Sequence, residues 1–358
     1  MKNCHKTTTA ILVTGGAGFI GSNFIPYFLE KHENYRVINL DKLTYAGSLE
    51  NLKEVEGHPR YYFIKGDICN RELVDYIFCE FHIKGVINFA AESHVDNSIL
   101  EPDIFVRTNV LGAFTLIDAA RKNWMAEPHV PRNGYADCRF YHVSTDEVYG
   151  SLEGTGLFTE KTPYDPRNPY SASKAGSDMI VRSYNRTYGL NTVITNSSNN
   201  YGPRQHREKF IPTIIRKALA LEKIPVYGDG RHIRDWLHVL DHCRGIDAVF
   251  HQGESGETYS IGGKNEQENM YVVSKVCDIL DEVAEHCRKK SGIGRYSELI
   301  TLIADRPGHD RRYGLDTTKI ENEIDWKPET DFETGLYETV KWYVKKTAKG
   351  VDHGRGQQ

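Results

Sequence analysis

The chain has 358 residues, enough for one large domain or two moderate ones, each with a buried core. Its 45 basic and 49 acidic residues give a formal net charge of −4 and form no basic run, so no nucleic-acid partner is expected. No stretch approaches the roughly 20 apolar residues of a membrane helix, and the seven cysteines include no C-x-x-C pair, which predicts a soluble cytoplasmic protein with reduced thiols and no membrane partner.

Short apolar runs alternate with helical patterns through the first half of the chain. The runs that indicate buried strands are residues 11–13, 37–40, 61–64, 85–89 and 139–143. Helical periodicity lies between them at residues 19–31, 71–81 and 104–122. This alternation predicts an α/β fold, a Rossmann-type doubly wound parallel sheet with helices on both faces.

The regular alternation of strands and helices ends after a sixth predicted strand at residues 192–195. Helical patterns at residues 211–222, 272–290 and 332–345 then alternate with isolated strands, which indicates a smaller mixed α/β domain. We expect the parallel-sheet domain to comprise residues 1–198 with 235–262. The smaller, substrate-facing domain is expected to comprise residues 199–234 with 263–348, followed by a disordered tail at 349–358.

A glycine-rich turn follows the first predicted strand. Gly15 lets the chain turn, Gly18 leaves room for a pyrophosphate, and Gly21 allows the next helix to pack closely on the strand. Asp41 follows Gly21 by 20 residues, at the end of the second strand. A carboxylate there accepts hydrogen bonds from an adenosine ribose and repels a 2′-phosphate, so the pattern predicts NAD rather than NADP.

Further cofactor contacts are expected where the following strands end. Asp67 ends the third strand near the expected adenine, Ala90 and Ala91 end the fourth with small side chains, and Asn109 lies on the next helix. The remaining residues of the predicted cofactor site are Phe19, Ile20, Lys42, Thr44, Ile68, Ser93, Tyr170 and Lys174.

Tyr170 and Lys174 are four residues apart and therefore share one face of a predicted helix. A phenol has an ordinary pKa near 10, and an adjacent ammonium and a nicotinamide cation lower it, which predicts a phenolate that acts as a base. Thr145, Asp146 and Glu147 follow the fifth predicted strand. Together these residues predict an oxidising site with an elimination site beside it.

These motifs resemble the extended short-chain dehydrogenase/reductase superfamily. Within it, S-T-D-E-V-Y-G at residues 144–150 resembles the nucleotide-sugar 4,6-dehydratases, and further similar stretches span nearly the whole chain at residues 43–47, 90–96, 197–203, 228–236 and 305–313. The resemblance implies a redox-neutral lyase that oxidises C4, eliminates water across C5 and C6, and reduces C6. It implies dTDP-linked glucose as substrate, with UDP-glucose or another nucleotide sugar as the open alternative.

The resemblance also implies a role for each site residue. Tyr170 takes the proton of the 4-hydroxyl, Thr145 hydrogen-bonds that hydroxyl, and Lys174 holds the nicotinamide ribose. Glu147 is the base at C5 and Asp146 the acid at O6. The implied substrate contacts are Arg234 and Arg306 for the diphosphate, Tyr227 for the base, and Ser93, His94, Thr145, Asn199, Lys209, Asn269 and His309.

Superfamily members commonly form homodimers through two long helices of each subunit, and the candidates here are residues 104–122 and 170–188. Some positions depart from the family pattern. Asn97 and Asn196 stand where we expect arginine, and residues 204–207, R-Q-H-R, replace a commoner aromatic and proline run. These departures leave the preferred nucleotide open.

Two other functions compete with the dehydratase. A nucleotide-sugar 4-epimerase has the same fold and the same tyrosine–lysine pair, but it needs no acid and base at Asp146 and Glu147. A non-catalytic NAD-binding regulator would lack Tyr170 or Lys174, and both are present. The histidines show neither H-E-x-x-H nor Cys/His ligand spacing, so no metal is expected.

Overall fold

The structure, a computed structural model, describes residues 8–354 and is built around one seven-stranded sheet. Its strand order is β12-β8-β7-β4-β1-β2-β3, and every pair of neighbours is parallel. The strands are β1 (Thr9–Thr14), β2 (Tyr35–Asp41), β3 (Tyr61–Lys65), β4 (Gly85–Asn88), β7 (Arg139–Thr145), β8 (Thr192–Ser197) and β12 (Thr258–Ile261). The predicted doubly wound α/β fold is confirmed.

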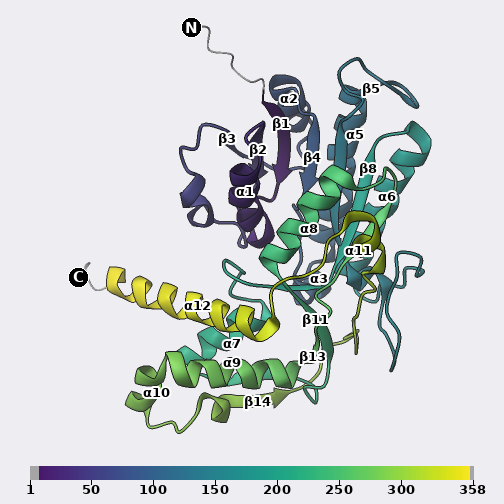
Figure 1. The fold of residues 1–358 in the computed structure, drawn as a ribbon. Helices are drawn as coiled ribbons and strands as arrows, with labels where there is room; N and C mark the ends of the chain where they lie inside the picture. The colour runs from purple at the N-terminus through teal and green to yellow at the C-terminus, as the bar shows by residue number, and fades with distance from the viewer. Residues whose placement is uncertain (1–7, 355–358) are drawn as a thin grey trace.

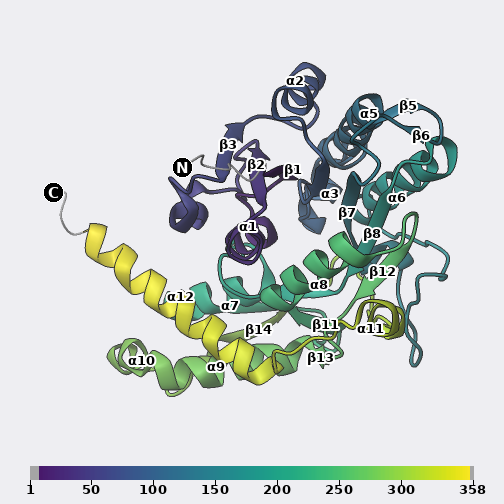
Figure 2. The same ribbon diagram turned by 45° about the horizontal axis from the view of Figure 1, so that its top comes forward.

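Helices cover both faces of this sheet (Figures 1 and 2). On one face, α1 (Phe19–Lys31) and α8 (Val239–Gln252) pack on Ile11 and Val13 of β1. On the other, α2 (Arg71–Phe81), α5 (Ala113–Trp124) and α6 (Pro169–Tyr188) share a core with Leu12 of the same strand. Successive strand side chains point to opposite faces, so a run of apolar residues supplies both cores at once.

The predicted helix at residues 104–122 is one helical run with an altered middle. It starts as α4 (Pro102–Phe105), widens into a π-helix, η2 (Val106–Gly112), and continues as α5. Gly112 lies in the wide turn, where a Cβ would collide with the side chain of Ile68. The lack of a side chain at Gly112 therefore lets the turn approach the loop after β3.

A second body lies beyond the carboxyl ends of the sheet strands (Figure 1). It has its own apolar core, formed by helices and two small sheets. Its elements are β9 (Asn199–Tyr201), α7 (Phe210–Leu219), β10 (Ile224–Tyr227), β11 (Ile233–His238), β13 (Glu266–Glu268), α9 (Asn269–Val283), α10 (Glu285–Ser291), β14 (Ile300–Ile303) and α12 (Phe332–Gly354).

Three predicted boundaries differ from the structure here. The helix predicted at 272–290 breaks at Ala284, whose backbone leaves the helical region between α9 and α10. β11 spans the predicted domain boundary at residue 235, so the domain division remains a prediction. α12 continues to Gly354, so the first part of the predicted disordered tail is helical, while residues 355–358 lie outside the described range.

The remaining elements are short. They are η1 (Leu49–Val55), α3 (Val95–Leu100), β5 (Met125–Glu127), β6 (Val130–Pro131), η3 (Asp146–Tyr149), η4 (Tyr296–Leu299) and α11 (Thr318–Ile324). Among residues 8–354, no helix has both the length and the apolar character needed to cross a membrane.

Candidate active site

A cleft runs along the carboxyl ends of the sheet strands and reaches the segment before α7. It collects most of the residues that the sequence predicts for the site, although they come from distant parts of the chain. The predicted residues that line it are Gly15, Gly18, Phe19, Ile20, Gly21, Asp41, Lys42, Thr44, Asp67, Ile68, Ala90, Ala91, Ser93, Thr145, Asp146, Glu147, Tyr170, Lys174, Asn199 and Lys209.

The glycine turn has the shape that a pyrophosphate needs. Gly15 has a φ of +68°, and a Cβ on it would lie 2.7 Å from the backbone nitrogen of Ala90. A Cβ on Gly21 would lie 2.6 Å from the carbonyl oxygen of Gly15. α1 begins directly after Gly18 without a side-chain cap, so its first N–H groups and its dipole can receive an anion.

Asp41 lies at the end of β2, in the wall of the cleft. Its carboxylate accepts hydrogen bonds from the backbone nitrogens of Ala17, at 2.8 Å, and Leu43, at 2.7 Å. Burial raises the pKa of Asp41, and these two bonds oppose the rise. Each carboxylate oxygen has a second lone pair, so Asp41 can also bind ribose hydroxyls, and the turn and the carboxylate together fit NAD.

Asn109 is buried, and its amide is hydrogen-bonded to protein groups, so its predicted contact with the cofactor remains a prediction. Its Nδ2 donates to the carbonyl oxygen of Glu92, at 3.0 Å, and to the Ser173 hydroxyl, at 2.8 Å. Its Oδ1 accepts from the backbone nitrogen of Glu92 at 2.8 Å. The Asn109 amide therefore connects the loop after β4 to α6 through hydrogen bonds.

α6 presents Tyr170 and Lys174 to the cleft. The helix starts with a capping box between Asn168 and Ser171 and with Pro169 in its first turn. This start sets Tyr170 one residue inside the helix, and both Tyr170 and Lys174 are buried. The two side chains therefore have a fixed position under the end of β7.

The protein groups alone do not acidify Tyr170 as the sequence analysis expected. Burial raises the pKa of the phenol, the charge of Glu147 raises it further, and hydrogen bonding with Thr145 opposes the change. Burial lowers the pKa of Lys174 to about 8. The cationic nicotinamide ring would add a positive charge to that of the Lys174 ammonium, and both charges favour the phenolate.

Asp146 and Glu147 form the first turn of η3, immediately after β7. Burial raises the pKa of Asp146 far above its usual range, and the charges of Glu147 and Asp235 add to this. Burial also raises the pKa of Glu147, but Arg306, Arg234 and Lys209 oppose it. Different surroundings of two carboxyl groups assign different roles: the strong upward shift suits Asp146 to donate a proton, and the opposed shift suits Glu147 to accept one.

One oxygen of each carboxyl group, Oδ2 of Asp146 and Oε2 of Glu147, is buried without a hydrogen-bond partner among the described residues. Both residues line the cleft. Buried polar atoms are otherwise nearly always paired, so these two oxygens are suited to bind a polar ligand in the cleft.

The predicted diphosphate residues gather beside Glu147, outside the lining of the cleft itself. The guanidinium of Arg306 lies 5.9 Å from the Tyr227 ring centre, and that of Arg234 lies 4.2 Å from the Tyr313 ring centre. Both arginines act on the pKa of Glu147. The positive charges of both arginines therefore influence Glu147 at the reaction site. Groups that bind a phosphate beside this site would have the same effect.

The other three predicted substrate residues have structural contacts of their own. His309 stacks on His232 with ring centres 3.8 Å apart, and its Nδ1 lies 2.6 Å from Asp305. His94 caps α3, and Asn269 is the first residue of α9. None of the three lines the cleft, so their contact with substrate remains a prediction.

Two of the departures from the family pattern, Asn196 and Arg204, have structural roles. Asn196 donates to the carbonyl oxygen of Thr145 at 2.9 Å and so supports the end of β7. Arg204 turns toward the sheet domain, where it meets the Ser22 carbonyl at 2.5 Å and Glu54 at 2.6 Å. His206, by contrast, lines the cleft, and its ring lies 5.4 Å from that of Tyr45.

Asp178 is a site residue that the sequence analysis missed. It is fully buried and accepts hydrogen bonds from Ser144, at 2.8 Å, and Tyr164, at 2.9 Å. Its charge also opposes the lowering of the Lys174 pKa by burial. The spacing of four residues from Lys174 on one helix was the signal that could have found it.

Comparison with known proteins agrees with this geometry. A family model described as GDP-mannose 4,6 dehydratase matches residues 12–339. A dTDP-glucose 4,6-dehydratase from Neisseria gonorrhoeae is 50% identical over 335 residues, which cover 93% of this chain and 95% of that protein.

Two solved structures show that the fold alone does not separate a dehydratase from an epimerase. A dTDP-glucose 4,6-dehydratase from Bacillus anthracis, in complex with NAD, has a TM-score of 0.80 at 45% identity and covers 95% of this chain and 98% of its own. A UDP-glucose 4-epimerase from Thermotoga maritima has the same TM-score of 0.80 at 27% identity, covering 95% and 100%. Because the backbone is equally similar to both, the side chains of the site must separate the two activities.

Proposed function

The chain belongs to the GDP-mannose 4,6 dehydratase family, and on that premise we propose that it is a dTDP-glucose 4,6-dehydratase. This hydro-lyase converts dTDP-glucose into dTDP-4-keto-6-deoxyglucose and water, with NAD as a cofactor that undergoes no net change. The observation that carries the proposal is the carboxyl pair of buried Asp146 and partly buried Glu147, which lines the cleft beside Tyr170 and Lys174, because a 4-epimerase has no use for that pair.

The first step is oxidation at C4 of the sugar. Tyr170, as phenolate, takes the proton of the 4-hydroxyl, and Thr145 holds the same hydroxyl through its own side chain. Lys174 binds the nicotinamide ribose and stabilises the phenolate. Bound NAD supplies a hydride acceptor for C4 and, at the end of the cycle, a hydride donor for C6.

The second step is loss of water. The 4-ketone makes the C5 hydrogen acidic, so that Glu147 can remove it as a proton. Asp146 delivers a proton to O6, and the C6 hydroxyl leaves as water with the electrons of its C–O bond. The proton then returns to C5 from Glu147 while C6 is reduced, which completes a 4-keto-6-deoxy sugar.

The nucleotide-diphosphate end of the substrate is proposed to lie across the cationic cluster beside Glu147. The forked guanidinium groups of Arg234 and Arg306 suit phosphate oxygens, and Tyr227 is proposed to stack on the base. Lys209 holds the wall of the cleft through a 2.6 Å hydrogen bond from its Nζ to the carbonyl oxygen of Ser93, and it adds a third positive charge.

A homodimer is proposed for the assembled enzyme. Apolar side chains are exposed along the two predicted interface helices and the preceding α3. Leu100 on α3 is 78% exposed, and Val106 on η2 is 55% exposed. Ile104, Leu111, Phe114 and Met179 continue this surface. A second copy of the same surface would bury it. We also propose a cytoplasmic enzyme, because the six cysteines among the described residues are free thiols.

The test is to supply purified enzyme with dTDP-glucose and UDP-glucose in separate reactions and to identify the product by NMR. We expect dTDP-4-keto-6-deoxyglucose from the first and little conversion in the second. Preferred conversion of UDP-glucose to the 4-keto-6-deoxy product would reassign the nucleotide. A 4-epimer as sole product would show that the enzyme is an epimerase.

A further inference from the structure

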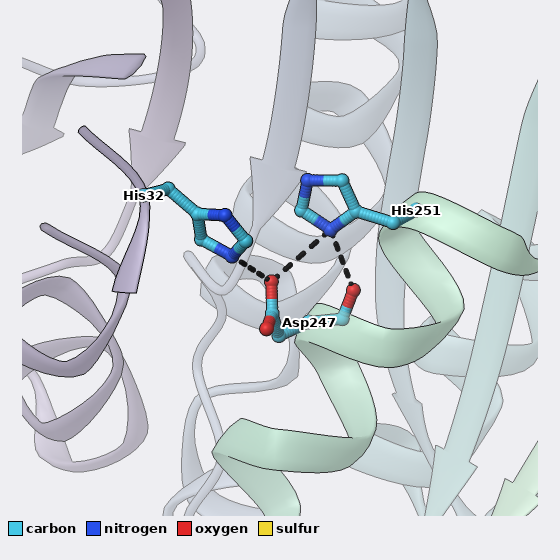
Figure 3. Close-up of side chains that lie close together, drawn as sticks. All are labelled: His32, Asp247 and His251. Carbon is cyan, nitrogen blue, oxygen red and sulfur yellow. Dashed lines mark hydrogen bonds and ion pairs between the residues drawn. The ribbon is translucent and has the colours of Figure 1, made fainter. Parts of the chain in front are cut away.

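His32, Asp247 and His251 form a cluster outside the cleft, between the end of α1 and the last turns of α8 (Figure 3). His32 Nε2 lies 2.7 Å from Asp247 Oδ1, and His251 Nδ1 lies 3.1 Å from the same oxygen. The two imidazole rings face each other at 4.6 Å with an angle of 25° between their planes. Both rings thus reach one carboxylate oxygen, and His251 Nδ1 also lies 2.9 Å from the backbone carbonyl oxygen of Asp247, a contact that a ligand of this nitrogen would replace.

The surrounding structure holds this cluster in place. The Asp247 side chain is 2% exposed, whereas those of His32 and His251 are 18% and 30% exposed. Arg60 donates to the carbonyl oxygen of His32 at 2.5 Å, and Arg139 donates to that of Phe250 at 2.9 Å. The backbone next to both rings is therefore fixed, while solvent still reaches the rings.

We propose that these three residues bind a divalent transition-metal ion of the zinc class. One potential ligand atom from each residue lies within 4.8 Å of the other two. Two imidazole nitrogens and a carboxylate oxygen are a ligand set that Zn²⁺ and its neighbours in the series prefer, with water at the open position. The side-chain exposure of His32 and His251 supplies the entry path.

Lys31 and Tyr27 occupy the other side of the same carboxylate. Lys31 Nζ lies 2.7 Å from Asp247 Oδ2, and the Tyr27 hydroxyl lies 3.2 Å from it. They leave Oδ1 to the histidines. The Lys31 side chain is 53% exposed and can turn toward solvent, so its ammonium competes with a metal ion without excluding it.

The metal ion would connect two helices of the cofactor domain. His32 directly follows α1, whose other end receives the pyrophosphate, and Asp247 and His251 belong to α8. A ligand that binds only the folded chain stabilises it in proportion to the logarithm of its concentration. The site is therefore expected to raise thermal stability, and it takes no part in sugar chemistry.

The test uses tag-free, chelator-treated protein, because a polyhistidine tag would bind the same ions. Zn²⁺ is titrated by calorimetry, and Co²⁺ is followed by its visible absorbance. We expect one ion per chain, a higher Tm with Zn²⁺, and binding weakened by roughly 10-fold or more in both His32→Gln and His251→Gln. Lys31→Gln should bind the ion more tightly, because the competing ammonium is gone.

The matched control is His232→Gln, which alters the second His–Asp–His group of the described residues, His232, Asp305 and His309. This variant should keep the ion at His32 and His251. If His32→Gln and His251→Gln bind Zn²⁺ as wild type does, or if only His232→Gln weakens binding, the proposal is wrong. Failure of wild type to bind Zn²⁺ or Co²⁺ at micromolar concentrations would overturn it as well.

Discussion

Lys174 donates a 2.6 Å hydrogen bond from its Nζ to the carbonyl oxygen of Val143. Val143 lies two residues before Thr145, the last residue of strand β7. The bond therefore connects the helix that carries Tyr170 to the strand that delivers Thr145, Asp146 and Glu147. It fixes the ammonium of Lys174 at the junction of the oxidising and eliminating parts of the site.

The pH dependence of C4 oxidation should reflect Lys174. Burial lowers the pKa of this lysine to about 8, so its ammonium is present below that pH and is lost as pH rises through it. Since the charge stabilises the Tyr170 phenolate, the rate of oxidation should fall above about pH 8. Rapid-mixing measurements of nicotinamide absorbance from pH 6 to 10 test this.

Lys174→Ala and Lys174→Arg are the variants for the same measurement. Lys174→Ala should oxidise dTDP-glucose very slowly at every pH and bind NAD less well. Lys174→Arg keeps its charge over the whole range, so any residual activity should show no loss near pH 8. A wild-type profile that stays flat to pH 10 would contradict the role assigned to the ammonium.

Glu147→Gln should separate oxidation from elimination. The amide is too weak a base to remove the C5 proton, and general-base catalysis typically contributes about 10²–10⁴-fold. The variant should oxidise C4 and then stall with reduced cofactor and 4-keto-glucose nucleotide bound. Nicotinamide absorbance should rise on mixing and decay slowly, whereas wild type shows little lasting signal.

Two comparisons make that result specific. Tyr170→Phe should fail before any absorbance change, because no phenolate is left to take the 4-hydroxyl proton. Glu153→Gln, which alters an exposed glutamate close by in the chain, should behave as wild type. Normal delivery of the 4-keto-6-deoxy product by Glu147→Gln would show that another group removes the C5 proton.

Asp41→Arg should weaken NAD binding and relax discrimination against NADP. The change removes the carboxylate that accepts from the ribose and supplies a cation for a 2′-phosphate. Because Asp41 also accepts from Ala17 and Leu43, the variant's thermal unfolding must be recorded beside its cofactor affinity. Glu80→Gln on α2 is an exposed control. Unchanged NAD affinity in a folded Asp41→Arg would remove Asp41 from the site.

The apolar surface on α3 to α6 predicts the oligomeric state. Wild type should have the mass of a dimer by light scattering at micromolar concentration. Val106→Asp should shift the mass toward the monomer, because a carboxylate would be buried in the interface. Leu302→Asp is the matched control, since Leu302 is 56% exposed on β14 of the second body. A monomeric wild type would contradict the prediction.

Local patterns in the sequence predicted much of the fold and the site. α1 and α2 have the bounds that helical periodicity indicates, and the glycine turn lies where its spacing and the preceding strand place it. Tyr170 and Lys174 could be paired because a spacing of four residues places side chains on one helix face wherever the helix packs. Such features depend on backbone geometry over a few residues, which the local sequence determines.

Tertiary structure decided which groups share an environment. It joined the Asn109 amide to Glu92 and Ser173, and it brought Arg306 close enough to act on the pKa of Glu147. It also joined His32 to Asp247 across 215 positions of the chain. Burial and charge depend on every segment that packs around a side chain, and no spacing within one segment encodes them.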